Sequence, residues 1–542
     1  MHGTAFINGK IYIQRDTFVS ALLAENGRIT QIGDDKSILA SAGKDTEIVD
    51  CGGKTVIPGL NDSHMHLLMV GRAMERVDIT GCRSVDELVE RVRAFAAAHP
   101  EATAHGIHSV GWNQDLFTRG EKRLPTRWDL DRISTEYPIA LERVCGHVLT
   151  ANSKAIELLG LHRGSPQFEG GTYETDETGE PNGVFTENGC NPVHRLFPPP
   201  GEADCRRMFL RGAEYALAHG ITSVQSNDAG TSVMPREQFF AMTDDIYARG
   251  ECPLRYRHQI CASSPEDLEE LAKAGFFDPA RYRDPERLAP GPLKLFKDGS
   301  LGGRTATMRQ GYLDDPGNYG VETLTEAQMD ALCRTADRLG IQVVTHVIGD
   351  KAIEDTVTSY ERVFRGGKNP LRHGLIHCQI TDRPLLERIA RDQIPVFYQP
   401  IFLDYDMHAV ISRCGEALSS TSYAFRTLPA LGGRVAYGTD SPVEDCNPFP
   451  NLYAAVTRKD KAGWPEGGFF PAERVDVFDA VDAYTAGSAY VEFREKDKGR
   501  LRPGYLADLV VLDTDIFTCD PMEIGRILPE MTVVGGEIVY RK

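Results

Sequence analysis

The long central part of the chain alternates short apolar segments with amphipathic segments of helical length, and this alternation constrains the fold most strongly. Candidate strands lie near residues 55–60, 221–226, 253–260, 293–297, 342–346, 373–377, 394–399 and 434–438. Helical segments separate the later strands, for example residues 326–339 and 383–392. Because strands that alternate with helices favour a parallel sheet with helices outside, we predict an α/β fold. The expected architecture is a (β/α)8 TIM barrel over residues 56–489.

The first and second candidate strands are separated by far more residues than one connecting helix needs. We therefore predict an inserted subdomain after strand 1, over approximately residues 80–215. The run Pro198-Pro199-Pro200-Gly201 is typical of a linker and marks the predicted exit from the insertion.

Both ends of the chain consist of short strand-like segments and turns. Residues 5–13 predict a hairpin through Asn8-Gly9, residues 507–513 predict a strand, and residues 531–540 predict a second hairpin. We expect residues 1–55 and 490–542 to form one small composite β-sandwich.

The composition is that of an ordinary globular enzyme, with 542 residues, of which 41% are hydrophobic and 25% charged. The net charge of −18 argues against nucleic acid or an anionic membrane as partner. The N-terminus lacks the features of a signal peptide, and the 12 cysteines show no C-x-x-C spacing. We expect a cytoplasmic protein with reduced thiols, and we favour packing over a nucleophilic role for Cys378, beside His377.

The segment after the first candidate strand carries the chemistry-bearing pattern Asp62-Ser63-His64-Met65-His66. Alternate residues of an extended strand point to one face, so Asp62, His64 and His66 share a face. Two imidazoles spaced in this way can bind one metal ion, although an isolated His-x-His is more often incidental.

Further candidate ligands follow the same rule, because each belongs to a later strand or to its end. They are Lys294, His346, His377 and Asp440. Taken singly, each histidine could be a satisfied core residue, Asp440 a turn residue and Lys294 a solvated lysine. Taken together, side chains at the carboxyl ends of barrel strands converge on one mouth. Imidazoles with a carboxylate suit a borderline ion such as zinc.

The order His-x-His, Lys, His, His, Asp on a (β/α)8 barrel resembles the amidohydrolase superfamily. More narrowly, the chain resembles the amidohydrolase-3 family of YtcJ-like hydrolases, which includes N-substituted formamide deformylase. The narrower match depends on residues 146–153, 293–306, 346–352 and 504–512, and the resemblance covers essentially the whole chain.

The resemblance implies a metal-dependent hydrolase that cleaves the C–N bond of a linear, N-substituted, non-peptide amide with a metal-activated hydroxide. It implies one or two zinc or similar divalent ions bound by His64, His66, Lys294, His346, His377 and Asp440. Lys294 is expected to be carboxylated by CO2 and to bridge the ions; Lys297, at an odd offset, points to the opposite face. Asp440 is expected to act as general base and then as general acid.

The resemblance also implies substrate contacts for His147 and Arg304, and Trp112 could form an apolar wall of the pocket. Each has a plain alternative, which is a structural role for His147, a loop salt bridge for Arg304 and ordinary packing for Trp112. Asp62 is expected to orient a ligand histidine. The expected partners are a small-molecule substrate and a second copy of the chain in a homodimer.

Two other classes of function stay open from the sequence. A deaminase or cyclic-amide hydrolase could use the same scaffold, and ammonia release would distinguish deamination. A binding protein built on a retired barrel is disfavoured because no expected ligand is missing. Motifs of other hydrolases and of phosphate-binding loops do not occur in the sequence.

Overall fold

The computed structural model describes residues 3–143, 147–197, 199–230 and 233–542. The chain divides into two compact units, one made of residues 1–70 and 209–542 and the other of residues 71–208. Each unit has its own sheets. The smaller unit occupies the region in which the sequence predicts an insertion, with bounds of 71–208 where we expected approximately 80–215.

The larger unit contains the strands predicted for the central region, and neighbouring strands pair in parallel. In chain order they are β8 (Leu60–Met65), β14 (Ile221–Ser226), β15 (Arg255–His258), β16 (Ile260–Cys261), β18 (Leu293–Phe296), β19 (Val343–Val347), β20 (Gly374–His377), β21 (Val396–Tyr398) and β22 (Val435–Tyr437). They form two sheets, β17-β15-β14-β8 and β16-β18-β19-β20-β21-β22, where β17 is Leu288–Ala289.

Within the described residues the strand ladder does not close into the single barrel that we predicted. It is interrupted at Gln259, between β15 and β16, although its amide still donates to the Ser226 carbonyl at 2.8 Å. At the other edge, β22 and β8 form no continuous ladder in the part of the chain that the structure describes. They are joined by a backbone hydrogen bond after the end of β22, in which the Asp440 amide donates to the His64 carbonyl at 2.8 Å. The sheets therefore approach one another through isolated backbone bonds.

The first predicted strand, residues 55–60, is wrong in its assignment to the barrel. Residues Thr55–Pro58 form β7, which pairs with β2 and β23 of a terminal sheet, and the parallel strand begins only at Leu60. Gly59 separates the two strands, and a Cβ there would lie 2.2 Å from Thr222 Oγ1. The close approach of the chain to Thr222 of β14 thus requires glycine, and His64 lies within the strand that follows, β8.

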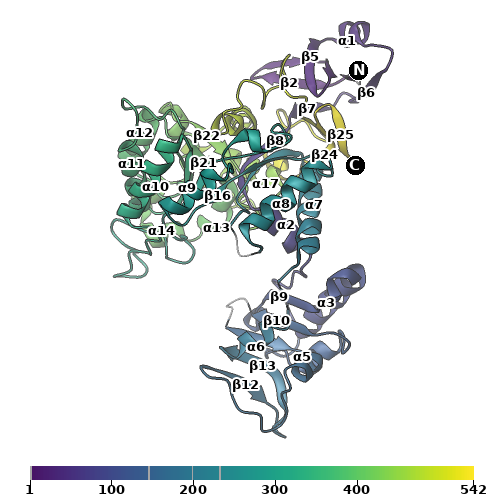
Figure 1. Ribbon diagram of the computed structural model, residues 1–542, viewed down its shortest axis with the longest axis vertical. Helices are drawn as coiled ribbons and strands as arrows, with labels where there is room; N and C mark the ends of the chain where they lie inside the picture. Colours follow the sequence, from purple (N-terminus) through teal and green to yellow (C-terminus); the bar gives the residue numbers. More distant parts are fainter. Residues whose placement is uncertain (1–2, 144–146, 198, 231–232) are drawn as a thin grey trace. The chain divides into compact units, whose positions relative to one another are not determined.

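Amphipathic helices cover the outside of the parallel strands, as α9 (Pro265–Lys273), α10 (Glu326–Leu339) and α11 (Asp350–Glu361) illustrate (Figure 1). Helix α10 has the predicted bounds because Thr325 and Gln328 form a capping box and Gly340 ends it in a left-handed conformation. Its apolar side buries Met329 and Leu332. Among the described residues, no helix combines the length and apolar character needed to cross a membrane.

Two further sheets come from the chain ends. The sheet β5-β4-β1-β6 uses N-terminal strands only, whereas β25-β24-β23-β7-β2-β3 combines both ends. Their bounds are β1 (Gly3–Ile7), β2 (Lys10–Gln14), β3 (Thr17–Val19), β4 (Ala21–Glu25), β5 (Arg28–Gly33), β6 (Thr46–Asp50), β23 (Leu509–Leu512), β24 (Pro529–Val534) and β25 (Glu537–Arg541). Apolar side chains from both ends, including Phe6, Val56 and Leu509, form one core.

The hairpin predicted through Asn8-Gly9 is wrong. Strand β1 pairs with β4 and β6, whereas β2 pairs with β3 and β7 of the other sheet. Asn8 does adopt the left-handed conformation expected of a tight turn, with φ of 52°. The turn nevertheless passes the chain between sheets, because the parallel strand β6 occupies the edge of β1. The predicted C-terminal hairpin is present as β24 and β25.

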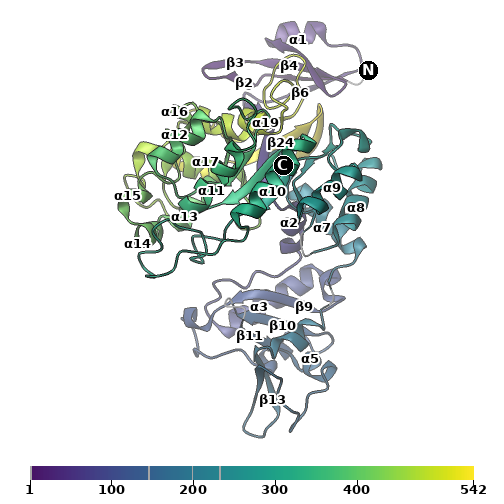
Figure 2. The same cartoon turned by 60° about the vertical axis from the view of Figure 1, so that its left-hand side comes forward.

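The smaller unit has a five-stranded sheet of order β12-β13-β11-β10-β9. Its elements are α3 (Val85–Ala98), β9 (Ile107–Trp112), α4 (Arg127–Asp131), β10 (Ile139–Arg143), β11 (Val148–Ala151), α5 (Ser153–Leu158), β12 (Gly171–Thr175), β13 (Pro181–Glu187) and α6 (Cys190–His194) (Figure 2). Strands β9 and β10 are parallel, and the other pairs are antiparallel. Side chains of α3 pack with Trp112 and Leu141 in its core.

Candidate metal centre

The predicted ligands lie on, or just after, the parallel strands of the larger unit. Strand β8 carries His64 and precedes His66, and the others are Lys294 (β18), His346 (β19), His377 (β20) and Asp440 (after β22). Parallel strands present their carboxyl ends on one side of a sheet, so side chains from distant parts of the sequence can meet there.

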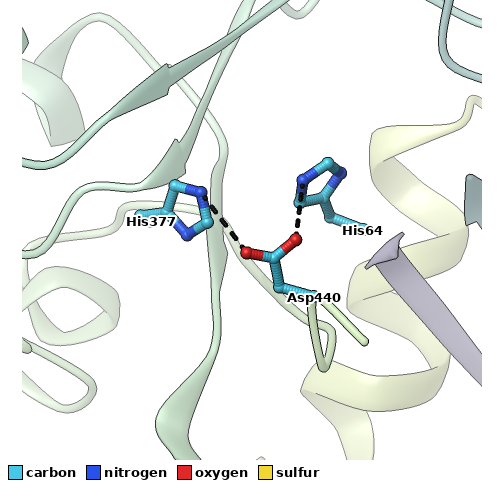
Figure 3. A group of neighbouring side chains, drawn as sticks. All are labelled: His64, His377 and Asp440. Atoms are coloured by element: carbon cyan, nitrogen blue, oxygen red, sulfur yellow. Dashed lines mark ion pairs between the residues drawn. The ribbon is translucent and has the colours of Figure 1, made fainter. Parts of the chain in front are cut away.

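The Asp440 carboxylate lies among imidazoles that face it with the same ring nitrogen (Figure 3). Its Oδ1 is 3.3 Å from His64 Nε2 and 3.2 Å from His66 Nε2, and its Oδ2 is 3.9 Å from His377 Nε2. Two atoms about 2.0–2.1 Å from a tetrahedral zinc ion would lie about 3.3 Å apart. The two shorter separations match this spacing, and the donor atoms of His64, His377 and Asp440 all lie within 4.8 Å of one another, so this group suits a divalent ion.

Buried amides hold the histidine rings in this orientation. The Oε1 atoms of Gln259 and Gln399 lie 2.6 Å and 2.7 Å from Nδ1 of His64 and His377, respectively. The Asn227 carbonyl lies 2.7 Å from His66 Nδ1. An acceptor at Nδ1 keeps the proton there and leaves Nε2 free to bind a metal. The sequence analysis missed these three residues, although each directly follows a parallel strand.

His346 and Lys294 lie beside this group, and no ion pair joins either of them to Asp440 in the described part of the chain. The His346 and His377 rings have centroids 4.5 Å apart, and His346 Nε2 lies 2.9 Å from the Gly299 carbonyl oxygen. Lys294 is 1% exposed, with its Nζ 4.0 Å from the centroid of the Phe296 ring. Lys294 is thus a buried amine that lacks a carboxylate partner among the described residues.

The protonation states favour metal binding. Burial lowers the pKa of His64 to about 4 and that of His346 to about 3, whereas Asp440 outweighs burial at His66 and raises its pKa. Burial alone would raise the pKa of Asp440, but the imidazoles, His64 foremost, hold it well below its ordinary value. His64 and His346 are therefore neutral and need no deprotonation before they bind an ion, whereas His66, with its raised pKa, loses a proton when it binds one.

The backbone at the site adopts conformations that few residues tolerate. His377 and Asp440 have φ of 71° and 55°, in the left-handed region that side chains other than glycine seldom occupy. Asp62 secures the turn before Asp440 by accepting from the Thr439 amide at 3.0 Å and hydroxyl at 2.6 Å. It also accepts from the backbone amide of His64 at 3.1 Å. Asp62 therefore supports two ligands through the backbone, where we expected it to orient a ring.

A cavity of about 300 Å³ opens near these ligands. Phe402, one of its lining residues, stacks on His377 with ring centroids 5.7 Å apart and an interplanar angle of 14°. The apolar side chains Leu301, Ile348, Tyr405 and Val443 also line it, and its polar lining residues include Gln379, Asp406 and Glu444. A larger cavity of about 960 Å³ lies beside the start of β22, and none of the predicted ligands is among the lining residues of either cavity.

Several residues singled out by the sequence have other partners. The Arg304 guanidinium pairs with Asp314 at 2.8 Å, which makes it a brace of the segment between β18 and α10. Lys297 forms an ion pair with Glu322. Among the described residues, it is therefore not the buried lysine without a carboxylate partner, which is Lys294. Burial raises the pKa of the Cys378 thiol far above its ordinary value, in keeping with a packing role.

Trp112 and His147 belong to the smaller unit. Trp112 is 0% exposed, its Nε1 donates to the Leu141 carbonyl at 2.9 Å, and it packs in the core of that unit. This burial fits the plain alternative of ordinary packing, and a substrate contact of Trp112 stays a prediction. His147 is exposed, and its Nδ1 lies 3.0 Å from Glu187 Oε2. A substrate contact of His147 stays a prediction.

Comparison with known proteins gives a consistent relationship over nearly the whole length. Residues 47–540 match the model of the Amidohydrolase family. YtcJ of Bacillus subtilis, an amidohydrolase by name, is 30% identical over 526 residues, which cover 96% of each chain. N-substituted formamide deformylase of Arthrobacter pascens is 27% identical over 539 residues, 97% of this chain and 96% of its own.

A solved structure supports the same relationship in three dimensions. A metal-dependent hydrolase from Pyrococcus furiosus, described as uncharacterized, superposes with a TM-score of 0.75 at 29% identity. The match covers 95% of this chain and 100% of that one.

Proposed function

Since the chain belongs to the amidohydrolase family and is a hydrolase of the metal-dependent superfamily, we propose that it cleaves the C–N bond of a linear, N-substituted, non-peptide amide. The observation that carries the proposal is the Asp440 carboxylate between His64, His66 and His377, each presenting Nε2. We further propose that the parallel strands act as one (β/α)8 barrel whose carboxyl ends form the active-site mouth.

His64, His66, His377 and Asp440 would hold one divalent ion, with zinc favoured by the donor set. When bound, such an ion lowers the pKa of water and polarises a carbonyl group. His346 and Lys294 would complete a site for a second ion. Burial lowers the pKa of Lys294 to about 8, so an unprotonated amine, the form that reacts with CO2, is accessible near neutral pH.

Asp440 is the proposed proton carrier. Its ionised carboxylate can accept a proton from the attacking water and release it to the leaving nitrogen. The left-handed backbone at Asp440 and the bonds between Asp62 and Thr439 hold the carboxylate in place for this transfer. A fixed position favours proton transfer because the acceptor must lie within hydrogen-bond reach of the proton.

The cavity beside His377 supports a substrate with a compact apolar substituent. The cavity has a volume of about 300 Å³, and its apolar lining includes Leu301, Ile348 and Phe402. These features suit an alkyl or aryl group on the amide nitrogen. The formamide deformylase from Arthrobacter acts on N-substituted formamides by name, which agrees with this class. The net charge of −18 argues for an uncharged small molecule over a polyanion. A homodimer and a cytoplasmic location stay predictions.

The test is a substrate panel assayed with metal-loaded and metal-stripped protein. The panel contains N-alkyl and N-aryl formamides, longer linear amides, cyclic amides and amino-substituted purines. We expect amine and carboxylate release from the linear amides, loss of turnover after chelation, and recovery with zinc. Ammonia release from a purine would assign a deaminase, and ring opening alone would assign a cyclic-amide hydrolase. Full turnover in the stripped protein would contradict metal dependence.

A further inference from the structure

A second cluster of metal-binding side chains lies in the smaller unit, and the proposed hydrolysis makes no use of it. His108 Nε2 is 3.3 Å from Glu142 Oε2, and His194 Nε2 is 3.2 Å from the same oxygen. All the donor atoms of this group lie within 4.8 Å of one another. The imidazole centroids of His108 and His194 are 5.3 Å apart. The cluster therefore repeats the arrangement of imidazoles around one carboxylate.

The local fold places these residues together. Strands β9 and β10 pair in parallel with His108 opposite Ala140, so Glu142, two residues on, shares the face of His108. Helix α6 follows β13 and carries His194 as its last residue. The cluster thus joins two adjacent strands to a helix that lies about 50 residues further along the chain.

The distances within the cluster, which are those of hydrogen bonds between each imidazole and Glu142, also suit a bound cation. Charge-assisted bonds between an imidazolium and a carboxylate are about 2.7–2.9 Å long, whereas the observed separations are 3.2 Å and 3.3 Å. Donors around a tetrahedral zinc ion would lie about 3.3 Å apart. Both histidines present Nε2 to the same carboxylate oxygen, as at the centre around Asp440.

The carboxylate of the cluster is buried, whereas its two histidines are partly exposed to solvent. Glu142 is buried, with 7% exposure, while the His108 and His194 side chains are 20% and 37% exposed. His108 lines a cavity of about 390 Å³ within the same unit, beside Phe197, whose ring stacks on the His108 imidazole with centroids 5.4 Å apart. The exposed edges of His108 and His194 let a small ion reach the cluster without unfolding of the unit. The buried carboxylate would supply the negative charge that holds the ion against the positive charges of Arg72, Arg76 and Arg207, which line the cavity.

We propose that His108, Glu142 and His194 bind a divalent transition-metal ion, zinc by preference, at a site separate from the centre around Asp440. Two imidazoles and one carboxylate form a recognised zinc donor set. The same set also suits ferrous iron, so metal identity is part of the test. Three protein ligands leave a coordination position for water, and the ion would cross-link β9, β10 and α6.

The test measures bound metal in the full-length protein at controlled free zinc. We expect the wild type to bind one ion per chain more than Glu142→Gln, which keeps nearly the original side-chain volume, and than His194→Asn, which keeps a smaller polar side chain. The matched control is His162→Asn, since His162 is an exposed histidine of the same unit outside the cluster. The control should retain the wild-type count. In cobalt-substituted protein, Glu142→Gln should lose part of the visible absorption while the signal from the Asp440 centre persists.

Two further readouts keep the proposal testable if a variant misfolds. In the wild type, zinc should protect His108 and His194 from diethylpyrocarbonate, measured by peptide mass spectrometry, and should leave His162 reactive. Zinc should also raise the Tm of the wild type more than that of Glu142→Gln. Equal metal counts in wild type and Glu142→Gln, or no protection of His108 by zinc, would overturn the proposal. Tighter binding of ferrous iron than of zinc would overturn the choice of zinc alone.

Discussion

Replacing Gln399 by leucine tests whether ring orientation controls metal binding. Gln399 Oε1 lies 2.7 Å from His377 Nδ1, and both residues are buried, with exposures of 3% and 2%. The substitution nearly preserves volume but leaves the Nδ1–H group without an acceptor. A buried donor left unsatisfied costs about 1–3 kcal/mol. The metal-free ring can turn or change tautomer to satisfy this group, whereas the metal-bound ring cannot, so the cost falls on the bound state. Because 1.4 kcal/mol corresponds to about a factor of ten, zinc affinity should fall by roughly 5- to 150-fold.

The assay is competitive titration of zinc into metal-stripped protein with a chromophoric chelator, followed by kcat/KM on the best substrate at saturating zinc. We expect the dissociation constant of the ion held by Asp440 to rise within that range. Outer partners of metal-bound histidines typically change affinity or activity by about 10- to 100-fold, which agrees with the value worked from the hydrogen bond.

The matched control is Gln225→Leu, which changes a fully buried glutamine within the parallel strand β14. Its Nε2 donates to the Ser488 carbonyl at 3.2 Å, and its side chain bonds to no predicted ligand in the described part of the chain. This variant should lose thermal stability and keep its zinc affinity. Wild-type affinity in Gln399→Leu, or an equal loss of affinity in Gln225→Leu, would refute the orientation argument.

Three other perturbations have defined outcomes. Asp440→Asn should lower kcat by about 10²–10⁴-fold and retain part of the metal, because asparagine tolerates the left-handed backbone but its amide accepts no proton. A near-normal kcat would show that Asp440 does not transfer the proton. Lys294→Ala should lose far more bound metal and activity than Lys297→Ala, and the reverse order in metal analysis would show that the wrong lysine was chosen. Burial lowers the pKa of His258 to about 3, below the value near 6.5 of an unfolded chain, so the unfolded state binds the proton first. The titration of His258 leaves the free energy of unfolding unchanged above about pH 6.5 and decreases it as the pH falls toward about 3. In His258→Phe, this decrease should be smaller when urea unfolding is measured between pH 8 and 5. An unchanged slope would contradict the assignment.

The candidate ligands and the order of the strands could be proposed from the sequence because both depend on local patterns. A short apolar run that ends in a polar residue predicts a buried strand with a functional end, and His346 and His377 fit this rule. Strand parity likewise predicts opposite faces for Lys294 and Lys297; Lys297 is paired with Glu322 in the structure, and the choice of Lys294 as ligand stays a prediction. These inferences needed no knowledge of which strands are neighbours.

The errors arose where pairing partners are distant in sequence. Residues 5–13 have a good hairpin signal, but β1 pairs with β6 and β2 with β7, each supplied by a later segment. The split of the first strand at Gly59 depends on contact with Thr222 across the fold. A local turn preference is worth little compared with the burial of a whole strand face, so tertiary pairing decides.

The sequence by itself determined the family, the α/β alternation and the identity of the candidate ligands, because motif order and hydrophobic period are properties of the chain alone. Only the tertiary structure decided which ring nitrogen each histidine presents, since the acceptors come from other strands; Gln259 is 195 residues from His64. Only the tertiary structure also brought His108, Glu142 and His194 together, because their spacing matches no motif. Side-chain orientation depends on partners that meet through folding, and no single segment of the chain contains that information.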